Sequence, residues 1–246
     1  MMPSDPKYFP AGNRIGELSR RLRQLERSHR PLSRAKVTTG CRALDRLLPG
    51  RGLVRGSLVE WFGDGPGSGA GTLALVAARE ACRSGGLLVV VDRDGTFYPP
   101  AAAAWGMDLQ NTMVARPEND KDECWSLDQA LRCRHVAAVV AWPSRLDAHT
   151  FRRLQLAAED GSCLGLFVRP QAVRGDPSWA DLQLSVSPQA SQAGWRLVVQ
   201  LLRCRGRFGK SEIELEINDR TGEIHEAHSG NPASQLARPE TSEHSA

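Results

Sequence analysis

The sequence predicts an α/β protein: a mainly parallel β-sheet flanked by helices, with antiparallel strands added at the C-terminal edge and one helix ahead of the sheet. Two observations lead to this fold class. Between residues 57 and 168, short continuous apolar runs alternate with helical patterns, which is typical of parallel strands buried on both faces. After residue 181, strand-like runs follow one another with only turns between them, which indicates antiparallel pairing.

Each element follows from its local pattern. We expect parallel strands at 57–62, 87–91, 112–115, 136–142 and 164–168. We expect helices at 13–30, in the second half of 37–48, and at 72–84, 99–105, 125–133 and 148–158. We expect a turn at 53–56, and antiparallel strands at 182–187, 195–204 and 212–217. The predicted domains are a loose N-terminus with a basic amphipathic helix (1–36), a core domain (37–227) and a disordered tail (228–246).

Composition sets broad limits. Hydrophobic residues make up 41% and charged residues 24% of the chain, which is ordinary for a soluble globular protein. A net charge of +4 permits contact with DNA without requiring it. No apolar run approaches the roughly 20 residues that span a membrane. The six scattered cysteines form no CxxC pair, and no cysteine or histidine cluster has metal-ligand spacing, so we expect reduced thiols, no metal site and a cytoplasmic location.

A glycine-rich loop, GDGPGSGAGT at 63–72, stands between the first predicted strand and the next helix. This is the layout of a phosphate-binding P-loop. The last loop glycine is Gly69, so Ala70 stands where such loops carry lysine and Gly71 where they carry serine or threonine. The lysine normally contacts the β- and γ-phosphates, and the hydroxyl ligates Mg²⁺. Ala70 and Gly71 can do neither.

Two hypotheses for this loop stay open. Its backbone N–H groups could bind phosphate weakly at a helix N-terminus, or it could be a turn without a ligand, which we favour. Thr72 stands one position late for the Mg²⁺ role, and a one-residue shift in register would restore it. The sequence therefore assigns no cofactor, and ATP with Mg²⁺ is the alternative. The candidate nucleotide-binding residues are Gly63, Gly65, Gly67, Ser68, Gly69, Ala70, Gly71 and Thr72.

Two basic segments are candidate contacts for DNA or for a protein partner. The predicted helix 13–30 could pack on its own domain, on a neighbouring protomer or on an acidic partner, and we favour a contact between molecules. The basic hairpin after the strand 195–204 could contact phosphate or be a solvated turn. The candidate contact residues are Arg20, Arg21, Arg23, Arg27, Arg203, Arg205, Arg207 and Lys210.

Three stretches, in this order, resemble the core of RecA-type recombinases. They are VTTGCRALDRLLPGRGLVRGSLVEWFG at 37–63, LLVVVDRDGTFYPPAAAAWGMDLQNTMVARP at 87–117 and LGLFVRP at 164–170. Within that superfamily the pattern is most similar to the ImuA or SulA-like branch. The shared features are the basic N-terminal helix, the P-loop without lysine, the Ala-Trp-Pro at 141–143 and the basic hairpin LLRCRGRFGK at 201–210.

The resemblance also implies roles for single positions. Asp94 stands where RecA-type proteins carry their water-positioning glutamate, so it is the candidate catalytic residue, with a turn-capping carboxylate as the simpler alternative. After the Walker B strand, where an acidic residue is expected, stand Ala141, Trp142 and Pro143. With this acid and the loop hydroxyl both missing, ATP hydrolysis is expected to be absent or very slow.

As to function, the resemblance implies a RecA-like accessory protein of the SOS response to DNA damage. It would be a non-catalytic adaptor that supports error-prone translesion synthesis. Its partners would be an inactive Y-family polymerase homologue and an error-prone replicative-type polymerase, with RecA and DNA as further candidates and self-association through the N-terminal helix. The alternative is an ATP-dependent DNA-binding ATPase with an atypical P-loop. Binding to DNA that strengthens with ATP would favour this alternative, whereas partner binding insensitive to nucleotide would favour the adaptor.

Overall fold

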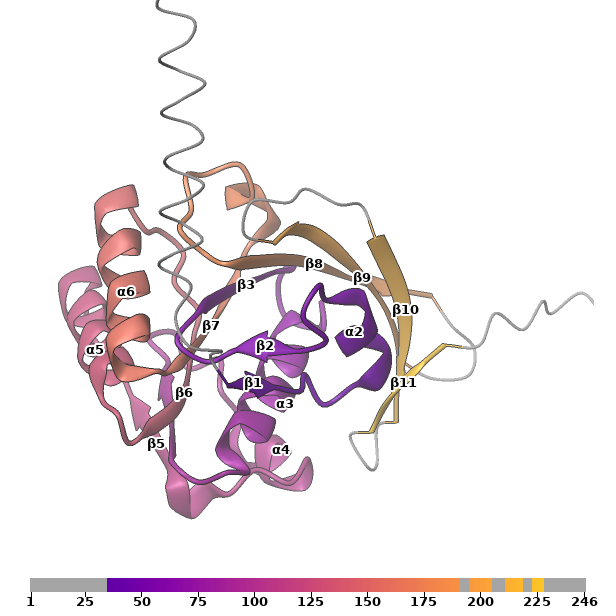
Figure 1. Ribbon diagram of the computed structural model, residues 1–246, viewed down its shortest axis with the longest axis horizontal. Coiled ribbons are helices and arrows are strands. Elements are labelled where there is room, and N and C mark those ends of the chain that lie inside the picture. Colours follow the sequence, from indigo (N-terminus) through magenta and orange to yellow (C-terminus); the bar gives the residue numbers. More distant parts are fainter. Residues whose placement is uncertain (1–34, 191–194, 205–210, 219–222, 228–246) are drawn as a thin grey trace, which may run out of the picture. The chain divides into compact units, whose positions relative to one another are not determined.

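The computed structural model describes residues 35–190, 195–204, 211–218 and 223–227 (Figure 1). From Lys36 onward these residues belong to one compact unit. The predicted helix 13–30, the hairpin tip 205–210 and the tail 228–246 lie outside the described residues.

The centre of this unit is a nine-stranded sheet in the order β11-β10-β9-β8-β3-β7-β6-β4-β5. Strands β3 to β8 pair in parallel, and β9, β10 and β11 continue the sheet in antiparallel fashion beyond β8. The predicted fold class is therefore confirmed. The strands are β3 (Leu58–Phe62), β4 (Leu87–Val91), β5 (Thr112–Ala115), β6 (Val136–Ala141), β7 (Leu164–Arg169), β8 (Leu182–Gln189), β9 (Trp195–Cys204), β10 (Ser211–Ile217) and β11 (Ile224–Glu226).

Helices cover the sheet in two layers (Figure 1). One hydrophobic cluster joins α5 and α6 to one face of the parallel strands, and the other joins α2, α3 and α4 to the opposite face and to the inner side of β9 and β10. The helices are α2 (Arg42–Leu47), α3 (Ala70–Cys82), α4 (Pro99–Ala104), α5 (Asp120–Arg132) and α6 (Ala148–Gly161). The unit also contains two single-turn 3₁₀ helices, at Leu109–Asn111 and Gln171–Val173.

Several observed boundaries differ from the predicted ones. Helix α3 begins at Ala70 rather than at residue 72, directly after the left-handed Gly69. Helix α5 begins at Asp120 rather than at residue 125, because the Asn119 side chain accepts a hydrogen bond from the backbone N–H of Asp122 at 3.0 Å and so caps the helix. The predicted turn at 53–56 begins with a strand, β2 (Leu53–Val54), which pairs with β1 (Lys36–Val37).

A further difference is β11, which the sequence did not predict. Its three residues are too few to show a periodic pattern, and the strand exists through its pairing with β10. Among the helices in the described ranges, none combines the length and the apolar character that a membrane crossing requires.

Candidate ligand site at the glycine-rich loop

The loop connects β3 to α3 at the carboxyl edge of the parallel strands, where ligand sites form in open α/β sheets. Two of its glycines are required by close packing. A Cβ on Gly63 would lie 2.4 Å from Ser68 Oγ, because the loop folds back on itself there. Gly69 has a left-handed φ of 84°, and a Cβ on it would lie 2.4 Å from Leu197 Cδ1 of β9. The loop therefore keeps a compact P-loop-like shape.

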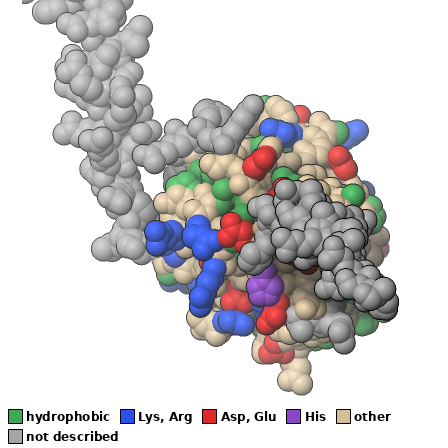
Figure 2. Space-filling model, turned by 90° about the vertical axis from the view of Figure 1, so that its right-hand side faces the viewer, with side chains coloured by type: hydrophobic (Ala, Val, Ile, Leu, Met, Phe, Trp, Pro, Cys, Tyr) green, Lys and Arg blue, Asp and Glu red, His purple; other side chains and the backbone are tan. Residues whose placement is uncertain are grey.

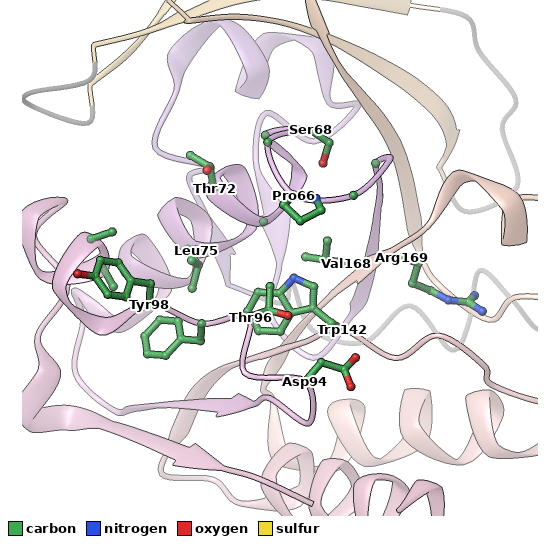
Figure 3. A pocket seen from close by; sticks show the side chains of 18 of the residues that line it. Pro66, Ser68, Thr72, Leu75, Asp94, Thr96, Tyr98, Trp142, Val168 and Arg169 are labelled. Atoms are coloured by element: carbon green, nitrogen blue, oxygen red, sulfur yellow. The ribbon is translucent and has the colours of Figure 1, made fainter.

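A cavity of about 480 Å³ opens beside this loop (Figure 3). Every predicted loop residue except Ala70 lines it, and so does Asp94. Ala70 is fully buried in the hydrophobic core instead. The structure thus brings together the loop and the candidate catalytic residue, which lie far apart in the sequence.

Five aromatic side chains also line the cavity. None of the five was predicted as a site residue, and at Trp142 the sequence indicated only that the expected acid is missing. The sequence could have indicated Trp142 as a site residue, because it directly follows a buried parallel strand, and site residues gather at the ends of such strands. The other four come from the segment after β4, from α4 and its end, and from β9. The five are Phe97, Tyr98, Trp105, Trp142 and Trp195.

Trp142 lies against the first turn of α3. Its Nε1 and Cζ2 atoms are 3.7 and 3.8 Å from the position that a Cβ on Gly71 would occupy. The indole therefore stands beside the position where a P-loop carries its Mg²⁺-ligating hydroxyl, and it replaces the expected Walker B carboxylate. A bound ATP with Mg²⁺ would need a lysine, a hydroxyl and a carboxylate here, and the chain supplies alanine, glycine and tryptophan. The residues present do not fit Mg²⁺-bound triphosphate.

The two aspartates after β4 have different surroundings. Asp92 is buried, and its carboxylate accepts hydrogen bonds from the backbone N–H groups of Thr96 at 2.8 Å and Phe97 at 3.1 Å. It therefore holds the turn that carries the cavity wall, a role that we had considered for Asp94. Asp94 itself is exposed at the cavity rim (Figure 3). Its catalytic role stays a prediction.

A buried ion pair lies behind the cavity wall. Arg169, at the end of β7, and Glu60, in β3, both have side chains without exposed surface, and Arg169 donates to Glu60 at 2.6 Å. Glu60 also accepts hydrogen bonds from Ser178 Oγ at 2.5 Å and from Gln183 Nε2 at 2.7 Å. The guanidinium of Arg169 points away from the loop (Figure 3). The positive charge nearest the cavity is thus already neutralised.

Of the predicted DNA or partner contacts, the described part of the chain includes Arg203 alone. It donates hydrogen bonds to the backbone carbonyls of Ser178 at 3.1 Å and Ala180 at 2.8 Å, so it holds the segment that follows β7. Arg20, Arg21, Arg23, Arg27, Arg205, Arg207 and Lys210 lie outside the described residues. On the face over α2, β10 and β11, described acidic and basic side chains are mixed (Figure 2), and Arg46 pairs there with Glu226.

Ionisable side chains and possible metal ligands contribute little to the chemistry of the cavity. Among the residues that the structure describes, no three His, Cys, Asp or Glu side chains gather as metal ligands. Burial and the nearby carboxylates of Asp120 and Asp94 raise the pKa of Glu123, beside the rim, although Arg93 opposes this shift. The aromatic rings of the lining can stack on a ligand, and hydroxyl residues such as Ser68 and Thr72 can hydrogen-bond to it.

The known proteins that this chain resembles are consistent with the observed fold. Residues 22–142 match the RecA N-terminal domain family. Protein RecA of Rubrobacter xylanophilus is 38% identical over 106 residues, which are 43% of this chain and 30% of that protein. Protein RecA of Rhodopirellula baltica is 31% identical over 104 residues, 42% of this chain and 28% of that protein. The chain thus spans less than a third of the length of these relatives.

A solved structure extends the similarity beyond this region. The crystal structure of the RadB recombinase superposes with a TM-score of 0.63 at 19% sequence identity, and the match covers 78% of this chain and all of that chain. At this identity the match shows a shared fold. The sequence matches to the RecA N-terminal domain family and to RecA proteins support a relationship to the RecA-type superfamily.

Proposed function

We propose that this chain is a non-catalytic RecA-like accessory protein of the SOS response, which supports error-prone translesion synthesis through protein contacts. The observation that carries the proposal is the position of Trp142 against Gly71, beside a loop that lacks its lysine. The chain keeps the shape of the loop, but an aromatic ring stands beside the position expected for the metal. We therefore infer that the fold is retained as a scaffold for protein contacts. The translesion role itself comes from the resemblance to the ImuA branch, which is a fold-level analogy.

The proposed partners are the inactive Y-family polymerase homologue and the error-prone replicative-type polymerase. The full chain would be immobilised and each purified polymerase passed over it, with and without ATP and Mg²⁺. We expect capture of at least one polymerase at equal affinity in both conditions. No capture of either polymerase would contradict the proposed role, and capture that requires ATP would contradict the scaffold proposal.

One observation keeps the ATPase alternative open: Asp94 and Thr72 both line the cavity beside the loop. ATP turnover by the full chain would therefore be measured with and without Mg²⁺, next to an Asp94→Asn variant. We expect rates indistinguishable from buffer for both proteins. Turnover well above background that the Asp94→Asn change abolishes would show a true ATPase and would overturn the non-catalytic assignment.

A further inference from the structure

The walls of the loop cavity have the chemistry of an aromatic site. Besides the five aromatic side chains, Leu75, Val168 and Pro170 contribute apolar surface. Aromatic rings in such walls favour another ring in an offset-stacked or edge-to-face arrangement. A cavity of about 480 Å³ lies within the range of small-molecule sites, which hold roughly 300–1,000 Å³.

The charged side chains at the cavity give a polyphosphate no net attraction. Among the described lining residues, the charged ones are Asp94 and Arg169. Arg169 is bound to Glu60 and turned away from the loop, so its charge is neutralised. Asp94 at the rim repels added negative charge. The loop residues Ser68 and Thr72 also line the cavity, and their hydroxyl groups can hydrogen-bond to a neutral heteroatom or hydroxyl.

We propose that this cavity binds an uncharged aromatic ring in place of a nucleoside triphosphate. The ring stacks against Trp142, and a polar atom at its edge accepts a hydrogen bond from the loop. This proposal rests on the proposed function, in which the site no longer binds a nucleoside triphosphate. It adds the class of ligand that the site binds instead. The ring could belong to a free nucleoside or to an aromatic side chain of a partner, since both present the same chemistry.

A phosphate series tests the proposal directly. Adenosine, AMP, ADP and ATP would be titrated against the full chain by calorimetry at one ionic strength. We expect adenosine to bind most tightly and ATP about tenfold more weakly, because each phosphate adds negative charge near Asp94. An affinity that rises with the number of phosphates would overturn the proposal.

A second titration distinguishes the two sources of the ring. N-acetyltryptophanamide represents a partner's aromatic side chain, and N-acetylleucinamide is its non-aromatic control. Binding of the tryptophan amide above the leucine amide, with no adenosine binding, assigns the site to a side chain. If neither adenosine nor the tryptophan amide binds, the proposal fails. That failure leaves the proposed function intact, because the latter depends on hydrolysis and on partner capture.

Variants locate the binding. Trp142→Ala should weaken binding of the preferred ring by about tenfold, the size expected for loss of one stacking partner. Trp142→Phe should keep most of the affinity, which separates stacking from the overall fold. Trp125→Ala is the matched control, because Trp125 is a 64% exposed tryptophan on α5 that does not line the cavity. Equal affinities of folded Trp142→Ala and wild type would contradict the assigned position.

Discussion

The parallel and the antiparallel halves of the sheet differ in how their faces are covered. This difference decides which sequence pattern predicts the strands of each half. In the parallel half, β6 has the sequence VAAVVA and is buried along its whole length. In the antiparallel half, β9 alternates between buried and half-buried residues, because its inner face alone contributes to the hydrophobic core. Continuous apolar runs therefore mark the parallel strands, whereas alternation marks the antiparallel ones.

The comparison also bears on function. The loop and its cavity lie mostly on the parallel half, yet the antiparallel strand β9 contributes Leu197, which packs at Gly69, and Trp195, which lines the cavity. The Glu60 network joins β3 and β7 to β8, where the two halves meet. The antiparallel half is therefore part of the site and not an appendage to it.

The strongest test of this junction is Glu60→Ala. It leaves the buried Arg169 with only the half-exposed carboxylate of Asp176, 3.9 Å away, as a counter-ion, so we expect a loss of about 3 kcal/mol in the free energy of unfolding, measured by urea denaturation. The matched control is Asp160→Ala, which removes one partner of the exposed ion pair with Arg132 and should cost less than about 1 kcal/mol. Similar losses for both variants would show that the buried Glu60 network contributes no more to stability than an exposed ion pair.

Two leucine truncations compare the halves directly. Leu166→Ala in β7 and Leu215→Ala in β10 each remove a fully buried side chain. We expect about 4 kcal/mol for Leu166, which packs inside the doubly covered half, and about 2 kcal/mol for Leu215, whose strand can relax towards solvent. The same denaturation measurement checks both, and equal costs would mean that the two halves are packed equally well.

The smallest expected effect is a pH dependence of the stability, and it arises from a cysteine on α3, one of the helices that pack on the parallel half. Burial raises the pKa of the Cys82 thiol on α3 from 9.0 to about 11. Between these values the unfolded chain releases the proton while the folded chain keeps it, so stability falls as the pH rises through this window. A Cys82→Ala variant should show a shallower decline of the unfolding free energy over the same window. An unchanged slope would contradict the shift.

Local patterns predicted much of this fold for identifiable reasons. The run at 87–91 predicted the bounds of β4 as observed, since a buried strand is apolar throughout and ends at polar or glycine residues. The bounds of β5 were also predicted as observed, although this strand lies at the edge of the sheet and is partly exposed. The starts of α4 and α6 were predicted as observed, whereas α5 begins earlier than predicted, because its cap Asn119 acts before the apolar pattern begins. The loop was found because its glycines and its missing lysine are visible in the sequence.

The sequence by itself determined the order of strands and helices, the glycine loop, and the absence of lysine at Ala70 and of an acid at 142. These are local properties, set by periodicity and by the identity of single residues. Only the tertiary structure decided that Trp142 lies against Gly71, that Leu197 packs at Gly69 and that Glu60 pairs with Arg169. Such contacts join residues that are far apart in the chain. They depend on the order of the strands in the sheet and on how the helices pack against it, and local sequence patterns do not predict either.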